Sequence, residues 1–256
     1  MSLRRYASFT TTAALIGAIV FAGSATAASA AGEVDGLYSA SNESGGQFVQ
    51  LDKTDATATP LGSASATYEF LSVEVVDGLG YATGVVPGGD DVDDVYYVFT
   101  WNITTGAVLT TVPLTSSLAI DGVWALDTRI DGVLIAYVSF DNEDDAWISS
   151  INPVTGVVIP LVDLSLVDDG RIFEGLATNP VDGITYALAD YDNGVPATSP
   201  VDFGAGTIGD SVAYQEIADS LGDGWFSEGD FDETGVLWFT YSGGVSRTDA
   251  PLEVGV

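Results

Sequence analysis

The sequence predicts an all-β fold in which a four-stranded antiparallel unit recurs about five times. The first observation is a repeat of about fifty residues, because similar apolar runs follow a short turn at regular intervals along the chain. The second is that strand-like runs alternate with turn residues, while helical periodicity is almost absent. The turns that mark the repeat are Asp35-Gly36, Asp77-Gly78, Asp131-Gly132, Asp182-Gly183 and Thr234-Gly235.

The fourth unit shows how the first half of each repeat is expected to fold. A short strand at 174–177 leads to a turn at 179–183, in which glycine is free to adopt positive φ. The run at 184–189 that follows is apolar almost throughout, as expected of a strand buried on both faces. The runs after the other turns are therefore expected to be second strands as well.

The second half of the repeat is clearest in the second unit. Residues 95–101 form a third strand-like run, rich in aromatic and β-branched residues, and 107–114 form a fourth. The turn between them at 102–106 is matched in the next unit by the similar turn at 152–156. Each unit is therefore expected to contain four antiparallel strands joined by tight turns.

Units of this kind are typical of the blades of a β-propeller, whereas solenoid repeats of similar length would need helical periodicity. A β-sandwich or a β-helix is the alternative, but neither explains turn residues that return at a fixed phase. The first unit begins at its second strand, and nothing near the C-terminus supplies the missing inner strand. We therefore expect a propeller of about five blades in an open or truncated ring. The blades are expected near residues 31–70, 70–120, 121–170, 171–222 and 223–256.

Residues 1–30 predict a secretory signal peptide that does not belong to the fold. A positively charged start precedes an apolar stretch that is too short to span a membrane, and small residues suit cleavage near Ala27 or Ala30. The propeller domain is then expected over residues 31–256, with no membrane span in the mature chain. This predicts a bacterial protein that is secreted or associated with the cell surface.

The composition restricts the chemistry that the protein can perform. The formal net charge is −31, so nucleic acid and anionic lipid are repelled and are not expected as partners. The chain has no histidine and no cysteine, which excludes histidine triads, thiolate nucleophiles and disulfides. Carboxylates, hydroxyls and aromatic side chains remain, and Ca²⁺ is the metal ion that suits them best.

Three glutamates form one candidate site. Glu69, Glu174 and Glu228 each fall near the start of the first strand of a unit, and in propellers this strand lines the central channel. Converging carboxylates there would bind a ligand, hold a metal ion or act as an acid–base pair. Acids are abundant in this chain, so a coincidence of position is the alternative.

A second candidate site would bind Ca²⁺. Asp141, Glu143 and Asp145 place carboxylates at alternate positions of an expected loop between a second and a third strand. The segment lacks the central glycine and the distant bidentate glutamate of an EF-hand loop. A solvated acidic turn is the alternative interpretation. The densest groups of acids fall in such loops, so a site was expected at this end of the channel.

The repeat resembles that of the lactonase-like, SMP-30-like and YVTN-type group of secreted bacterial propellers, over most of residues 35–250. The resemblance implies the fold, and for SMP-30-like members it implies a metal-dependent hydrolase whose site uses Glu, Asn and Asp. The residues that carry it are Gly175-Leu176-Ala177, Asp182-Gly183, Tyr186-Ala187 and Ile151-Asn152-Pro153-Val154-Thr155-Gly156.

Three functions are open on the sequence alone. A secreted or cell-surface binding module without catalysis, with a protein or a carbohydrate as ligand, is favoured because no compact catalytic motif is present. A Ca²⁺-dependent hydrolase or lactonase is implied by the resemblance. A five-bladed glycoside hydrolase would instead use channel carboxylates.

Overall fold

The computed structural model confirms the all-β fold that the sequence predicts. Every regular element that it describes is a β-strand, and that part of the chain contains no helix long and apolar enough to cross a bilayer. The described residues are 20–21, 37–41, 46–51, 58–86, 94–140, 142–167, 171–191, 195–214, 226–232, 234–241 and 244–248.

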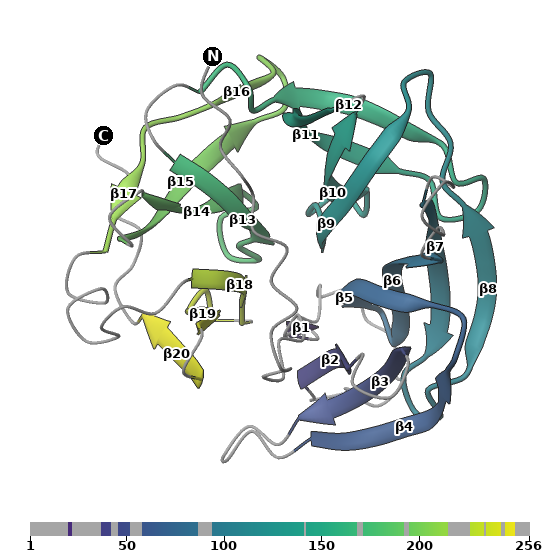
Figure 1. The fold of residues 1–256 in the computed structure, drawn as a ribbon. Coiled ribbons are helices and arrows are strands. Elements are labelled where there is room, and N and C mark those ends of the chain that lie inside the picture. Colours follow the sequence, from purple (N-terminus) through teal and green to yellow (C-terminus); the bar gives the residue numbers. More distant parts are fainter. Residues whose placement is uncertain are drawn as a thin grey trace.

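Within these residues, five antiparallel sheets lie around a common centre, and we call them blades 1 to 5 in chain order (Figure 1). In each blade the first strand lies nearest the centre and the later strands follow outward. Blades 1 and 2 contain β1 (Val20–Phe21), β2 (Leu37–Ser41), β3 (Gly46–Leu51), β4 (Ala58–Ser65), β5 (Glu69–Val76), β6 (Leu79–Val86), β7 (Val95–Asn102) and β8 (Val108–Pro113). Blade 3 contains β9 (Ile120–Thr128), β10 (Leu134–Phe140), β11 (Asn142–Ile151) and β12 (Val158–Asp163). Blades 4 and 5 contain β13 (Arg171–Thr178), β14 (Thr185–Tyr191), β15 (Pro196–Asp202), β16 (Thr207–Ile208), β17 (Val212–Ala213), β18 (Phe226–Phe231), β19 (Leu237–Tyr241) and β20 (Gly244–Thr248).

The turns between third and fourth strands show why a short motif recurs in the sequence. In blade 2 the side-chain oxygen of Asn102 accepts hydrogen bonds from the backbone amides of Thr104 and Thr105, at 3.0 and 2.9 Å. Asn152 makes the same bonds in blade 3. The glycine that closes this turn in blade 3, Gly156, has a φ of 72°. It lies so close to the Pro113 carbonyl of blade 2 that a side chain would not fit.

The hydrophobic core lies between neighbouring blades, because a strand that is buried on both faces has an adjacent sheet on each side. Between blades 1 and 2 the Trp101 ring stacks on Phe48, with centroids 4.2 Å apart and an interplanar angle of 5°. Tyr38 and Phe70 belong to the same cluster. Further clusters join blade 2 to blade 3, blade 3 to blade 4 and blade 4 to blade 5.

The two ends of the chain give blades that differ from the others. The sequence predicted that blade 1 lacks an inner strand, but Val20 and Phe21 fill that position and pair with Tyr38 and Leu37. This strand has two residues, whereas the inner strands of blades 2 to 4 have at least eight. In blade 5 the described residues form three strands. The unequal end blades fit the predicted open ring. Cleavage of residues 1–30 stays a prediction.

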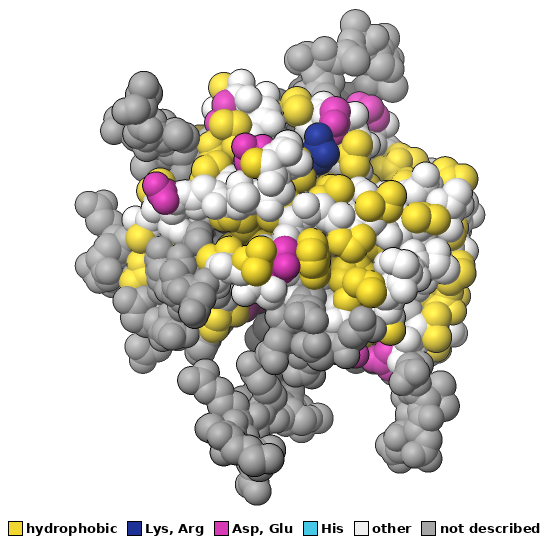
Figure 2. All heavy atoms as spheres, turned by 90° about the horizontal axis from the view of Figure 1, so that it is seen from above, with side chains coloured by type: hydrophobic (Ala, Val, Ile, Leu, Met, Phe, Trp, Pro, Cys, Tyr) yellow, Lys and Arg dark blue, Asp and Glu magenta, His cyan; other side chains and the backbone are white. Residues whose placement is uncertain are grey.

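One side of the outer flank exposes many hydrophobic side chains where it is described. Figure 2 shows this side, on which hydrophobic side chains are widespread and several acidic side chains lie in the upper part of the view. Leu109 on β8 and Ile159 on β12 are examples of exposed hydrophobic residues on outer strands. The acidic groups that concern function lie instead at the inner strands.

Candidate functional site

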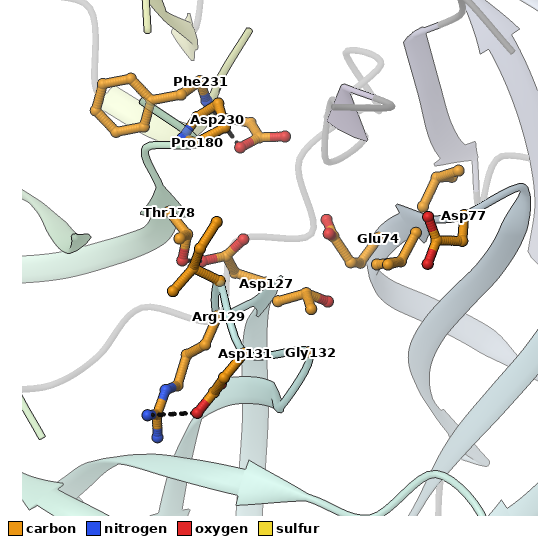
Figure 3. A pocket seen from close by; sticks show the side chains of 14 residues that line it. Glu74, Asp77, Asp127, Arg129, Asp131, Gly132, Thr178, Pro180, Asp230 and Phe231 are labelled. Atoms are coloured by element: carbon orange, nitrogen blue, oxygen red, sulfur yellow. Dashed lines mark hydrogen bonds and ion pairs between the residues drawn. The ribbon is translucent and has the colours of Figure 1, made fainter. Parts of the chain in front are cut away.

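One position near the end of each inner strand carries a polar side chain in blades 2 to 5. Asp127, Thr178 and Asp230 each lie five residues before the glycine of the turn that follows the strand, and Glu74 lies four residues before it. Because the blades repeat the same backbone course around a centre, equivalent positions face one another. Figure 3 shows Glu74, Asp127, Thr178 and Asp230 arranged around one space, each coming from a different blade.

Hydrogen bonds between blades hold this arrangement. The Leu126 amide of β9 donates to the Ser72 hydroxyl of β5 at 2.9 Å, which places Asp127 beside the strand that carries Glu74. The Thr178 hydroxyl of β13 donates to Oδ2 of Asp127 at 2.6 Å. Thr178 also lies 2.8 Å from the Thr185 hydroxyl, which is therefore the donor in that pair. Three successive inner strands are thus joined by polar contacts next to the site.

The space between these side chains is a cavity of about 300 Å³, lined by the ends of the inner strands of blades 2 to 5 and by turns that follow them. Two of the lining carboxyl groups are nearly inaccessible to solvent, since Asp127 is 3% exposed and Glu74 is 7% exposed. Asp230 is half-buried and accepts a hydrogen bond from the Phe231 amide at 2.7 Å. The cavity therefore combines a small volume with five acidic residues in its lining, the other two being Asp77 and Asp131.

Burial changes the ionisation of both inaccessible carboxyl groups. It raises the pKa of Asp127 from 3.8 to about 7, although hydrogen bonds from Thr178 and from the Thr128 backbone oppose the change. The pKa of Glu74 is raised well above its ordinary value, first by burial and then by the negative charges of Asp230 and Asp127. The Val75 backbone and the Thr128 hydroxyl, which lie near the Glu74 carboxyl group, lower its pKa only in part. The Thr128 hydroxyl makes no hydrogen bond of good geometry, so its effect is weak. At pH 7 Asp127 is therefore protonated in about half of the molecules, whereas an exposed carboxyl would have lost its proton, and the pKa of Glu74 is shifted in the same direction.

The cation nearest to these carboxyl groups does not neutralise them. Arg129 turns away from Glu74 and Asp127 and pairs with Asp131, whose Oδ2 lies 2.8 Å from Nη2 of the arginine (Figure 3). Its guanidinium carbon also lies 4.4 Å from the ring centroid of Phe203. Arg129, the one cation among the described lining residues, is therefore paired with Asp131 and not with Glu74 or Asp127.

The three glutamates predicted from the sequence lie on inner strands, and the two whose side chains are described, Glu69 and Glu174, do not line this cavity. Glu69 begins β5 and is exposed. Glu174 is half-buried at a β-bulge of β13, between Phe173 and Gly175. Glu228 falls at a bulge of β18, and its side chain lies outside the described part of the structure. A binding role for these three residues stays a prediction.

The predicted Ca²⁺ site falls largely outside the described residues. Asp141 is not described, nor are the side chains of Glu143 and Asp145. The segment differs from the expected loop, because strand β11 already begins at Asn142, which pairs with Phe140. Among the side chains that are described, no three acidic residues are grouped so as to hold a metal ion.

The sequence contains a signal for this cavity at the end of the inner strand, whereas the predicted glutamates lie near its start. An acid or a hydroxyl precedes the turn glycine by four or five residues in blades 2 to 5, in phase with the repeat. The cavity consequently lies at the end of the molecule formed by the turns between first and second strands. The site had been expected at the opposite end, where many of the acidic loops are not described.

Comparison with known proteins supports the fold and shows no family. No protein-family model matches the sequence, and no curated protein matches it. A luciferin-regenerating enzyme superposes with a TM-score of 0.53 and 11% identity, covering 91% of this chain and 72% of that one. A Bacteroides ovatus protein described as xyloglucan PUL GH43B gives a TM-score of 0.51 and 13% identity, covering 87% of this chain and 47% of that one.

At such low identity these likenesses show the fold alone. The solved structures that the chain resembles are β-propellers, and this confirms the architecture predicted from the repeat. The fold by itself does not select a function. The particular lactonase-like group that the sequence resembles is not shown by these matches.

Proposed function

We propose that the protein is a secreted or cell-surface binding propeller, and that its ligand enters the cavity around Glu74 and Asp127 with a cationic group. The observation that carries the proposal is the convergence of Glu74, Asp127, Thr178 and Asp230 from four blades on one cavity. Burying carboxyl groups beside one another opposes folding, because neither solvent nor a counter-ion stabilises their charge. A cationic ligand would supply the missing counter-charge.

The contacts also favour binding over a purely structural role. A structural buried carboxylate is normally paired with a cation, whereas the adjacent Arg129 is held by Asp131 and Phe203. The cavity volume of about 300 Å³ lies at the small end of ligand pockets, which suits one side chain or a small amine. A protein ligand would offer such a group, and so would an amino sugar.

The proposal is tested by calorimetric titration with butylguanidinium and with its neutral analogue butylurea. Saturable binding of butylguanidinium in the millimolar range is expected, with no detectable binding of butylurea. Binding should be lost in Asp127→Asn and retained in Asp121→Asn, which removes one exposed acid elsewhere on β9. Equal heats for the two compounds, or unchanged binding in Asp127→Asn, would contradict the proposal.

A second candidate function is a glycoside hydrolase that uses these channel carboxylates. It is favoured by one observation, the pKa of about 7 at Asp127, because a general acid works best with a pKa near the working pH. Release of nitrophenol from nitrophenyl glycosides, with loss of turnover in Asp127→Asn, would establish this function in place of binding. A Ca²⁺-dependent hydrolase stays a prediction, and a Ca²⁺ titration without saturation at millimolar concentration would exclude it.

A further inference from the structure

Apolar side chains occupy one repeated position in blades 2 to 4, at or near the cavity. Val76, Ile130 and Val181 each lie two residues before the glycine of the turn that follows an inner strand, in blades 2, 3 and 4. Ile130 is 58% exposed and Val181 is 67% exposed, while Val76 is half-buried. Val76 and Ile130 also line the cavity. We refer to these three residues as the apolar rim.

Two of the three rim residues, Ile130 and Val181, are adjoined by the turn of the following blade. A Cβ atom placed on Gly183 would lie 3.5 Å from the Ile130 side chain, and one placed on Gly235 would lie 3.1 Å from Val181. The glycines thus leave room for the neighbouring aliphatic side chain without covering it. Exposed aliphatic residues that adjoin one another around a cavity are typical of an interaction site, whereas isolated ones need no explanation.

The negative charge of the cavity favours a cationic group on the partner that covers the apolar rim. Two rim residues, Val76 and Ile130, line the same cavity as Glu74, Asp127 and Asp230, and the lining cation Arg129 is already paired with Asp131. An anionic membrane is disfavoured by the net charge of −31. A long cationic side chain with apolar neighbours would match both parts of the site, since its charge would reach the carboxyl groups and its neighbours would cover the rim.

We infer, building on the proposed function, that the apolar rim is the docking surface for a protein partner that inserts one arginine or lysine into the cavity. The partner presents this residue on a loop, between aliphatic residues that pack on Ile130 and Val181. Strong protein interfaces commonly have one central residue that contributes most of the binding energy, surrounded by residues that exclude water from it. The inserted arginine or lysine would be the central residue here, and the apolar rim would exclude water. Exclusion of water strengthens the interaction between the inserted charge and the carboxylates.

The experiment uses three blocked pentapeptides with the central sequences Val-Arg-Val, Ser-Arg-Ser and Val-Gln-Val. On the wild-type protein in about 0.15 M salt, the Val-Arg-Val peptide should bind at least about tenfold more tightly than Ser-Arg-Ser. The Val-Gln-Val peptide should not bind detectably. In the double variant Ile130→Asn/Val181→Asn the difference between the two arginine peptides should fall below about threefold. Both residues are exposed, so the variant should fold, which its urea unfolding curve verifies.

The outcomes separate this inference from the proposed function. If both arginine peptides bind equally to the wild type, or if the double variant keeps the difference, the docking surface is wrong while the cationic cavity stands. If neither arginine peptide nor butylguanidinium binds, the proposed function fails and the docking surface fails with it. If sedimentation reveals a dimer that the double variant disrupts, a second copy covers the rim and the inference is overturned.

Discussion

Asp127→Asn is expected to stabilise the protein at neutral and alkaline pH. In the folded chain the pKa of Asp127 is about 7, whereas its ordinary value is 3.8. The folded state therefore holds a proton that the unfolded state releases between these two values. The stabilisation that comes from this proton is complete below about pH 4, falls as the pH rises, and is gone above about pH 7. Asparagine does not ionise, so the variant avoids this loss.

The magnitude follows from the size of the pKa change. A difference of about three pH units corresponds to about 4 kcal/mol, since each unit contributes about 1.4 kcal/mol. Screening by solvent is small because Asp127 is nearly inaccessible. The carbonyl oxygen of asparagine can still accept the hydrogen bond that Thr178 donates at 2.6 Å. Asp127 and Glu74 share the repulsion between their charges, so the full gain of about 4 kcal/mol is an upper value. We therefore expect the free energy of unfolding to rise by about 2 to 4 kcal/mol at pH 8.

Urea unfolding at pH 4.5, 6, 7 and 8, with linear extrapolation to water, measures this gain. The free energy of unfolding of Asp127→Asn should exceed that of the wild type by only about 1 kcal/mol at pH 4.5, and the difference should grow towards pH 8. The control Asp121→Asn removes the same formal charge from an exposed position, and it should change stability by less than about 0.5 kcal/mol.

The reasoning would be refuted by either of two results. A constant difference between Asp127→Asn and the wild type at every pH would mean that no proton is held by this carboxyl group in the fold. Equal pH dependence in Asp127→Asn and Asp121→Asn would mean that general charge repulsion, and not burial, determines the effect.

Three further predictions concern packing, backbone strain and the pH dependence of binding. Replacing the fully buried Trp101 with alanine should cost about 3 to 5 kcal/mol in urea unfolding, because a large cavity forms between blades 1 and 2. Gly78→Ala should lower the free energy of unfolding by about 1 kcal/mol, because the residue has a positive φ. Gly156→Ala should lower it by at least about 1 kcal/mol more, because the new methyl group also meets the Pro113 carbonyl. Similar losses of stability in the two variants would disprove this close approach. The affinity for butylguanidinium should fall up to about tenfold for each unit of pH below 7, because binding must displace the proton of Asp127. A calorimetric affinity that does not change with pH would contradict this prediction.

Local patterns were sufficient to predict the strands. The aromatic and β-branched run at 95–101 corresponds to β7 (Val95–Asn102), and the run at 184–189 overlaps β14 (Thr185–Tyr191). Both runs are apolar because a neighbouring blade covers each face of the strand. Side chains on both faces must therefore be suited to burial. The turn glycines mark the ends of strands for an equally local reason, since the chain there needs positive φ.

The site could not be chosen from the sequence in the same way. Glu69 and Glu74 lie on one strand, β5, and only the three-dimensional structure distinguishes the exposed residue at its start from the buried one near its end. A bulge between Phe70 and Ser72 changes which faces of the strand the two side chains occupy. Burial at the centre also depends on several blades meeting there, and no single repeat encodes that convergence.

Repetition explains both the acidity of the cavity and its sensitivity to protons. Equivalent positions converge, so each blade that places an acid there adds one negative charge to the same small volume, as Glu74, Asp127 and Asp230 do. Thr178 interrupts the series and donates a hydrogen bond instead. The remaining repulsion can be relieved by a proton or by a cation, and the two must compete for the same carboxyl groups. Proton release on binding is therefore the property that would separate a ligand site from carboxyl groups that are merely buried.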